Sequence, residues 1–130
     1  MAQARLEHTN ITVSDPKRTA AWLTEVFGWH IRWQGPAMQT GYTVHVGSAD
    51  SYVALFSYGG SKPRQEDSYR TIGGLNHIAV FTEDIDAVET RVKAAGFTPV
   101  NHADYAPGRR FYFHDHDGIE WEVASHQVAS

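Results

Sequence analysis

The pattern of apolar and polar positions occurs twice along the chain. One segment opens at His8, continues through an alternating apolar run and reaches Asp15, and a similar segment runs from His77 to Asp84. Each aspartate is followed by a stretch in which apolar residues recur at helical spacing, and each stretch ends at a glycine. A repeat of this length predicts two modules built on the same plan.

One helix is predicted in each module, over residues 16–27 and 85–95. An aspartate precedes each helix, and this residue type caps helix N-termini. A glycine follows each helix and suits the left-handed conformation that ends many helices. The capping residues are Asp15 and Gly28 in the first module and Asp84 and Gly96 in the second.

Period-two alternation predicts one strand before each helix and three after it. The fold class expected is therefore α+β, as a single domain over residues 1–130 that contains two tandem βαβββ modules, 5–57 and 75–125, joined by a linker over 58–74. The strands after the helices are expected at 29–33, 42–46, 52–57, 98–102, 110–114 and 119–124, with turns at Gly35-Pro36, Gly47-Ser48, Pro107-Gly108 and Asp117-Gly118.

Composition narrows the classes of function. The 130 residues carry a formal charge of -4 and no lysine or arginine cluster, which argues against nucleic-acid binding. There is no cysteine, so any metal must be held by His, Asp or Glu. The sequence shows neither a signal-peptide core nor an apolar run of membrane-spanning length, and we expect a cytoplasmic protein without a membrane partner.

Two histidines and one glutamate form a candidate metal-ligand set. Strand alternation places His8 and His77 on the faces that point away from the helices, at equivalent positions of the two modules. Glu122 lies in the middle of a short final strand, where a buried carboxylate needs a charge partner or a metal. If the two half-sheets surround a shared cleft, the three side chains form a facial triad that suits Fe(II), Mn(II), Zn(II) or Ni(II).

The duplicated plan resembles the vicinal oxygen chelate superfamily. The resemblance covers about residues 6–125. This superfamily includes glyoxalase I, extradiol dioxygenases, methylmalonyl-CoA epimerase, fosfomycin-resistance thiol transferases and bleomycin-resistance proteins. It rests on the two His-to-Asp openings, on helices closed by Gly28-Trp29 and Gly96-Phe97, and on the final strand Asp117-Gly-Ile-Glu-Trp-Glu122.

The resemblance implies a cupped, partly open mixed β-sheet barrel with helices outside, around a divalent metal. His8, His77 and Glu122 match three of the four ligand positions, whereas Ala54 occupies the fourth, where glyoxalase I would have a carboxylate. A strict glyoxalase I role is therefore doubtful, and a three-ligand site with open positions remains. Two-module chains of this superfamily commonly form homodimers, and the modules can pair within one chain or across two.

Two functions follow from this resemblance. The first is a metal-dependent dioxygenase, lyase or isomerase in which Fe, Mn, Ni or Zn chelates vicinal oxygens of a small aromatic or apolar substrate, with Glu122 and His45 as catalytic candidates. The alternative is a metal-free, bleomycin-resistance-like protein that sequesters an aromatic ligand, which Ala54 and the many aromatic residues favour. Candidate substrate-binding residues, by strand parity or place near the cleft, are Phe56, Phe81, Tyr105, Arg109 and Phe111.

Three further observations bear on these functions. Fosfomycin-type thiol transfer would use the same three ligands. It also needs a cationic phosphonate site and a potassium-binding loop, and neither can be identified in the sequence. The cluster His114-Asp-His-Asp117 is interpreted as a turn, because Asp117-Gly118 is a hairpin signal. Glu120 has the strand parity of Glu122 but lies nearer this turn, and it is expected to be exposed.

Overall fold

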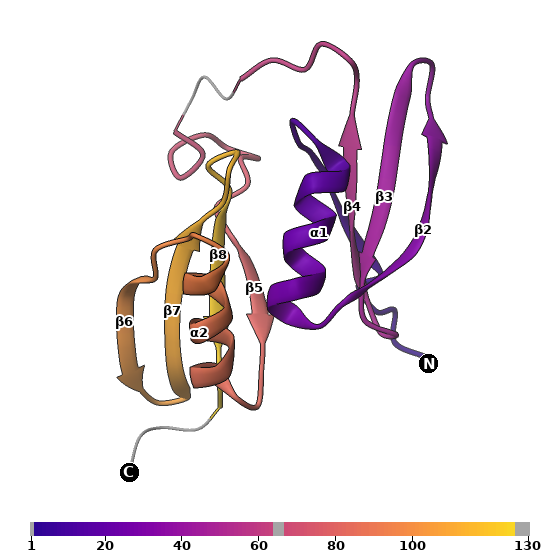
Figure 1. The fold of residues 1–130 in the computed structure, drawn as a ribbon. Helices are drawn as coiled ribbons and strands as arrows, with labels where there is room; N and C mark the ends of the chain where they lie inside the picture. The colour runs from indigo at the N-terminus through magenta and orange to yellow at the C-terminus, as the bar shows by residue number, and fades with distance from the viewer. Residues whose placement is uncertain (1, 64–66, 127–130) are drawn as a thin grey trace. The chain divides into compact units, whose positions relative to one another are not determined.

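The computed structural model describes residues 2–63 and 67–126 and divides the chain into two compact units, the first of which ends at Pro63. Each unit holds one βαβββ module, so the predicted pair of modules is confirmed (Figure 1). The first module contains β1 (His8–Thr12), α1 (Pro16–Phe27), β2 (His30–Ala37), β3 (Gly41–Gly47) and β4 (Tyr52–Ser57). The second contains β5 (Ile78–Phe81), α2 (Ile85–Ala94), β6 (Val100–Tyr105), β7 (Gly108–His114) and β8 (Glu120–Ala124).

Both sheets are mixed and have the same topology. The strand order is β1-β4-β3-β2 in the first module and β5-β8-β7-β6 in the second. In each module the first and last strands are parallel neighbours, and the remaining pairs are antiparallel. This register places His8 beside Tyr52 at the start of β1, and Ala79 beside Glu122 in the second sheet.

The helices begin where the sequence predicts. The side chains of Asp15 and Asp84 each accept a hydrogen bond from the backbone N–H three residues later, at 3.2 and 3.1 Å. Gly28 ends α1 in the left-handed region, with a φ of 71°. Gly96 has a φ of 94° shortly after α2, which ends at Ala94, one residue earlier than predicted. None of the helices in the described ranges is long and apolar enough to cross a membrane.

Each helix covers one face of its own sheet, and the core of each module lies between them. In the first module, α1 contacts β3 and β4 and buries Leu23 and Val26 together with Val44 and Leu55. Burial of side chains of this size stabilises the fold by about 1.5–3 kcal/mol each. In the second module the corresponding buried side chains are Val88, Val92, Phe111, Phe113, Trp121 and Val123. The opposite face of each sheet is left free of its helix.

One predicted turn is wrong and another is confirmed. Gly35-Pro36 lies inside β2, which continues to Ala37, and the chain turns afterwards, where the Gly41 N–H donates to Met38 O over 2.9 Å. Because β2 is the edge strand of its sheet, Pro36 is tolerated there without the loss of an inner ladder hydrogen bond. The turn at Asp117-Gly118 forms as predicted, and Gly118 has a φ of 76°.

Candidate functional site

His77 and Glu122 lie together on the helix-free face of the second sheet. The Nε2 atom of His77 is 2.9 Å from Oε1 of Glu122. The Glu122 side chain is only 6% exposed and that of His77 is 31% exposed. The pair forms because β5 and β8 are parallel neighbours, with Ala79 directly beside Glu122 and His77 two positions before Ala79. A nearly buried carboxylate thus faces an imidazole nitrogen.

Arg110 occupies the other oxygen of this carboxylate. Its Nη1 atom donates to Oε2 of Glu122 over 2.6 Å. Tyr112 lies beside Glu122 in the β7–β8 register, and its ring meets that of His77 edge to face at 5.8 Å. Burial, reinforced by the negative charge of Glu122, raises the pKa of Tyr112. The Glu122 carboxylate therefore has His77 at Oε1 and Arg110 at Oε2.

The second nitrogen of His77 also faces oxygen. Its Nδ1 atom lies 2.5 Å from the amide oxygen of Asn76 and 3.6 Å from Oε2 of Glu120. An amide oxygen only accepts hydrogen bonds, so Nδ1 carries a proton. A neutral imidazole has no second N–H, and its Nε2 lone pair then points at the carboxylate of Glu122. A second proton between Nε2 and Oε1, or a cation bound to both atoms, relieves this conflict.

Glu120 is part of the same cluster, and the expectation that it is exposed is wrong. Its side chain is 14% exposed and accepts a hydrogen bond from the Tyr69 hydroxyl. This hydrogen bond raises the pKa of Tyr69 to about 12. The Nε2 atom of His114 lies 3.5 Å from the other oxygen of Glu120. Tyr69 comes from a segment far from β8 in sequence, and no strand pattern predicts its contact.

The first module carries a stack of aromatic rings on the face opposite α1. The ring of Tyr52 lies 4.9 Å from that of His8 and 4.7 Å from that of His45, and the Trp33 ring follows at 5.3 Å from His45. Arg32 lies over the Tyr52 ring at 4.5 Å. Burial lowers the pKa of His45, and the positive charges of His8 and Arg32 lower it further. His45 is therefore held toward its neutral form.

Ala54, at the position of the expected fourth metal ligand, is in the central part of the first sheet. Ala54 is buried between Asn10 on β1 and His45 on β3. Phe56 lies two residues further along β4, on the same face as His8. The Nδ1 atom of His8 lies 2.9 Å from Oε1 of Glu7, which leaves its Nε2 as the atom for another partner.

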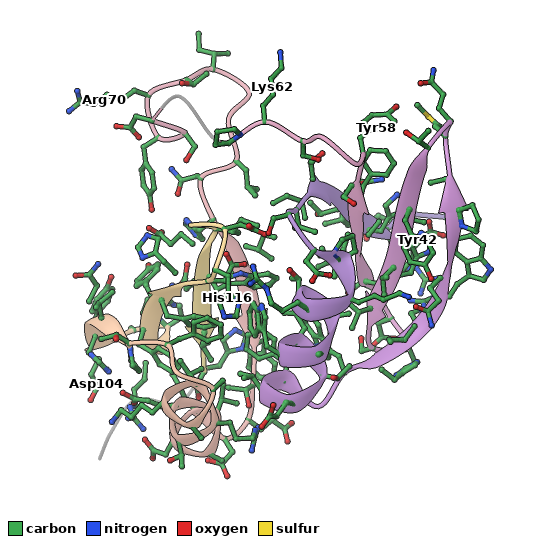
Figure 2. All side chains as sticks on the ribbon, turned by 45° about the horizontal axis from the view of Figure 1, so that its top comes forward. Tyr42, Tyr58, Lys62, Arg70, Asp104 and His116 are labelled. Atoms are coloured by element: carbon green, nitrogen blue, oxygen red, sulfur yellow. The ribbon has the colours of Figure 1, made fainter. Side chains whose placement is uncertain are left out.

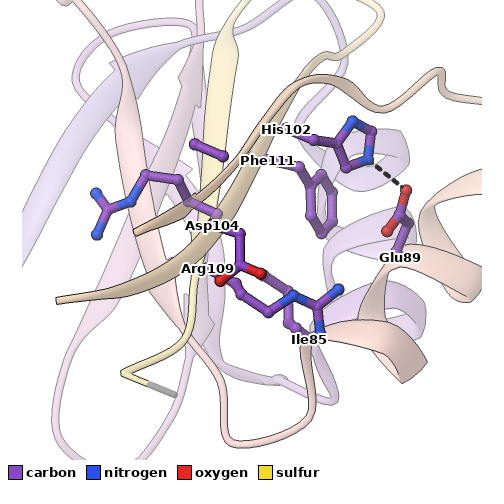
Figure 3. A pocket seen from close by; sticks show the side chains of 8 residues that line it. Ile85, Glu89, His102, Asp104, Arg109 and Phe111 are labelled. Carbon is purple, nitrogen blue, oxygen red and sulfur yellow. Dashed lines mark hydrogen bonds and ion pairs between the residues drawn. The ribbon is translucent and has the colours of Figure 1, made fainter. Parts of the chain in front are cut away.

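Arg109 and Phe111 lie on the other face of the second sheet from Glu122. The register places Phe111 beside Val123, and the ring is 1% exposed in the core under α2, which corrects the cleft-facing parity expected for it. Arg109 donates to both carboxylate oxygens of Asp86 at 2.8 and 3.3 Å, which lowers the pKa of Asp86. Both line a pocket of about 390 Å³ on the helix side (Figure 3).

Phe81 and Tyr105 are the remaining substrate-binding candidates, and both are well exposed. Phe81 shares the face of His77 in β5 and lies 4.5 Å from the His126 ring. Tyr105 ends β6 and pairs with Gly108, so it has the parity of Arg110 and Glu122. The structure thus leaves both rings accessible on the helix-free face of their own sheet.

Comparison with known proteins identifies the family of this chain. A sequence model described as the Glyoxalase/Bleomycin resistance protein/Dioxygenase superfamily matches residues 5–123. The chain belongs to this superfamily. The resemblance inferred from the two His-to-Asp openings is therefore confirmed. No curated protein matches the chain in sequence.

Solved structures of the superfamily share the fold. A glyoxylase/bleomycin resistance protein/dioxygenase domain from Frankia sp. EAN1pec is 24% identical, with a TM-score of 0.81, and 95% of this chain covers 93% of that one. TioX from Micromonospora sp. ML1 is 24% identical, with a TM-score of 0.69 and coverages of 95% and 99%. FosX from Listeria monocytogenes, solved with Mn(II) and sulfate, is 23% identical, with a TM-score of 0.72 and coverages of 95% and 93%.

Within the superfamily fold, the structure brings two of the three expected ligands together. His77 and Glu122 are paired in the second module, and His8 belongs to the first. Over residues 2–63 and 67–126, no cluster of three or more His, Cys, Asp or Glu side chains is arranged to hold a metal ion. Arg109 is the arginine among the predicted substrate-binding residues, whereas strand parity with Tyr112 shows that Arg110 is the arginine on the Glu122 face.

Proposed function

We propose that the protein is a metal-dependent enzyme in which His77 and Glu122 are two ligands of a divalent cation. The observation that carries the proposal is the 2.9 Å spacing between His77 Nε2 and Glu122 Oε1. Two ligand atoms at right angles around a metal, each at about 2.1 Å, are themselves about 3 Å apart. The pair therefore already has the spacing of neighbouring ligands.

The residues around this pair fit a cation. Asn76 holds the proton of His77 on Nδ1, so the Nε2 lone pair is the one presented to a metal. Arg110 donates to Oε2 of Glu122, whereas Oε1 faces Nε2 of His77 and is the oxygen proposed to bind the cation. Metal-binding histidines and carboxylates are commonly oriented by such outer partners. We assign the third ligand to His8, as the sequence analysis expects.

The metal would act as a Lewis acid toward vicinal oxygens of the substrate. The chain's own residues do the rest. Arg110 orients the carboxylate of Glu122 through its hydrogen bond to Oε2. His45, whose lowered pKa favours the neutral form, is able to accept a proton near neutral pH. Ala54 leaves the fourth ligand position open for substrate.

The substrate proposed is a small aromatic or apolar molecule with two neighbouring oxygens. The ring stack of His8, His45 and Tyr52 and the exposed Phe81 and Tyr105 supply aromatic surface for it. Fe, Mn, Ni and Zn all accept nitrogen and carboxylate ligands. The Mn(II) in the Listeria FosX structure supports a divalent metal on this fold. Dioxygenase, lyase and isomerase chemistry all remain within the proposal.

The proposal is tested by the metal content of tag-free protein. The protein is dialysed against Mn(II), Fe(II), Ni(II) and Zn(II) in turn, and bound metal is measured by plasma mass spectrometry. Wild type should retain about one equivalent of one of these metals, and Glu122→Gln should lose at least about 10-fold in affinity. The matched control is His102→Gln, because His102 pairs with Glu89 on the helix side. Equal retention by wild type and Glu122→Gln would overturn the proposal.

A metal-free binding protein is the second candidate, and the ion pair of Arg110 favours it. Arg110 neutralises Glu122 at 2.6 Å without any metal, so the carboxylate is compatible with an empty site. In that case wild type and both variants retain no metal after dialysis, and the aromatic stack of the first module alone captures a flat ligand. The same experiment therefore distinguishes the two functions.

A further inference from the structure

The pocket of about 390 Å³ on the helix side of the second module lies between α2 and the β6–β7 hairpin (Figure 3). It exists because α2 packs mainly against β8, whereas α1 of the first module packs against β2, β3 and β4. The edge strand β6 is thereby left largely uncovered by its helix. The lining includes Ile85, Glu89, His102, Asp104, Arg109 and Phe111.

A β-bulge in β6 places His102 in this pocket. The β6–β7 register shifts here, so Asn101 and His102 together oppose Phe111. Asn101 has a φ of 55°, in the left-handed region that asparagine adopts more readily than most residues. Nε2 of His102 lies 2.6 Å from Oε2 of Glu89, and the His102 ring stacks on that of Phe111 at 5.8 Å. Bulges often redirect side chains in this way beside functional sites.

Carboxylates outnumber the positive groups around this pocket. The hydrogen bonds of Arg109 to Asp86, at 2.8 and 3.3 Å, occupy both of its Nη atoms. They raise the pKa of Arg109, and the negative charges of Asp104 and Glu89 raise it further. Three carboxylates therefore interact with one guanidinium, and Asp86 accepts its hydrogen bonds.

The other positive groups of this region leave that excess of negative charge in place. Arg110 contributes to the lining, but its guanidinium pairs with Glu122 on the opposite face of the sheet at 2.6 Å. Nζ of Lys93 comes only to 3.9 Å from Glu89, and the Lys93 side chain is 65% exposed. A neutral His102 that donates from Nε2 adds a lone pair at Nδ1. The pocket therefore offers a ligand mainly hydrogen-bond acceptors and negative charge.

Apolar side chains accompany these charges. Ile85 and Phe111 line the pocket and are 6% and 1% exposed. The Glu89 side chain is 17% exposed, whereas Asp104 is exposed on β6, at the outer edge of the second sheet (Figure 2). A cation that reaches Glu89 is partly shielded from water, where charges attract each other more strongly than at the surface. A volume of this size suits a small organic molecule.

We propose that this pocket binds a small organic amine, whose ammonium group pairs with Glu89 and Asp104 while its apolar body contacts Ile85 and Phe111. This site lies on the opposite face of the sheet from the proposed metal ligands, takes a different ligand and needs no metal. Binding is measured with a metal chelator present, so a failure here does not count against the metal assignment.

Benzylamine, benzyl alcohol and benzoate serve as probes, because they share an aromatic ring and differ in charge at neutral pH. Each is titrated into 15N-labelled protein in buffer with EDTA, and the backbone amide signals are followed by NMR. Salt at about 0.15 M screens the general attraction of a cation to a chain with a net charge of -4. Benzylamine should shift the amide signals of His102 and Ala103 and saturate, whereas the other two probes at the same concentrations should not.

Two variants remove one negative charge each from the pocket with little change of shape. Glu89→Gln should weaken benzylamine binding about 10-fold, as expected for one lost hydrogen bond to a charged group. Asp104→Asn should weaken it about 3-fold, because this carboxylate is exposed to solvent. Glu83→Gln is the matched control, since Glu83 is exposed and lies outside the pocket lining, and it should leave the affinity unchanged.

Four results would overturn the proposal. The first is the absence of saturable benzylamine shifts at His102 and Ala103, or their restriction to residues of the first module. The second is equal binding of benzyl alcohol or benzoate, which would show that the ammonium group contributes nothing. The third is an unchanged affinity for benzylamine in both Glu89→Gln and Asp104→Asn. The fourth is an equal loss of affinity in Glu83→Gln, which would indicate attraction to the overall charge.

Discussion

Arg109 and Arg110 are adjacent in β7, yet their side chains lie on opposite faces of the second sheet. Arg110 donates to the nearly buried Glu122 at 2.6 Å, whereas Arg109 crosses to the exposed Asp86 of α2 at 2.8 Å. Strand alternation makes this division inevitable once β7 pairs with β8. The same residue type therefore has a partner of low exposure on one face and a solvated partner on the other.

These two environments predict different costs of removing the arginine. Arg110→Met should destabilise the protein by about 2–3 kcal/mol, because it leaves the buried Glu122 without its cationic partner. Arg109→Met should cost under about 1 kcal/mol, because Asp86 remains solvated. Urea unfolding of both variants measures the difference. Equal costs would show that the Arg110–Glu122 pair contributes no more than a surface ion pair.

The placement of Phe111 predicts a core role. Phe111→Ala should lower the free energy of unfolding by about 3–5 kcal/mol, because the ring is buried under α2 and its loss leaves a cavity. The control is Phe81→Ala, since Phe81 is 54% exposed and should cost under about 1 kcal/mol. Urea unfolding checks both. A small cost at Phe111 together with a loss of ligand binding would contradict this placement.

The surroundings of His45 predict a dependence of stability on pH. Burial, followed by the charges of His8 and Arg32, lowers the pKa of His45 below its ordinary value, with Glu7 opposing. The unfolded chain then binds a proton at higher pH than the folded one, so stability is lost as the pH falls from about 6.5 through the lowered pKa. His45→Gln should remove this part of the pH dependence of urea unfolding.

The titration of His45 can also be followed directly. Its ring signals in NMR should titrate below about pH 6.5. His8→Gln should raise the pKa of His45 while leaving it below the ordinary value, because burial, the larger cause, remains. A midpoint of His45 at or above that of an exposed histidine would contradict the account.

The module plan could be predicted from the sequence because each signal for it is local. Asp15 and Asp84 cap the helices through backbone groups three residues away, and alternation assigns the faces of His77 and Glu122. Alternation within one strand does not say which of its two faces the helix covers. The β7–β8 register places Tyr112 beside Glu122 and Phe111 beside Val123, so Phe111 lies on the face opposite Glu122.

The rest of the candidate site depends on contacts that no local pattern contains. Tyr69 meets Glu120 from a segment outside both sheets, and this contact makes Glu120 part of the cluster rather than an exposed residue. The proline of Gly35-Pro36 indicates a turn by residue type, but β2 accepts it because it is an edge strand. The place of β2 at the edge of the sheet therefore decides whether Pro36 ends the strand.

The most direct test of the metal assignment is to observe the nitrogens of His77 themselves. Tag-free protein labelled with 15N is titrated with Zn(II), and the histidine side chains are followed by NMR. We predict that Nε2 of His77 binds the ion while Nδ1 keeps its proton toward Asn76, that Glu122→Gln abolishes this change, and that His102 is unaffected. Unchanged His77 signals at saturating Zn(II), or binding through Nδ1, would contradict the account.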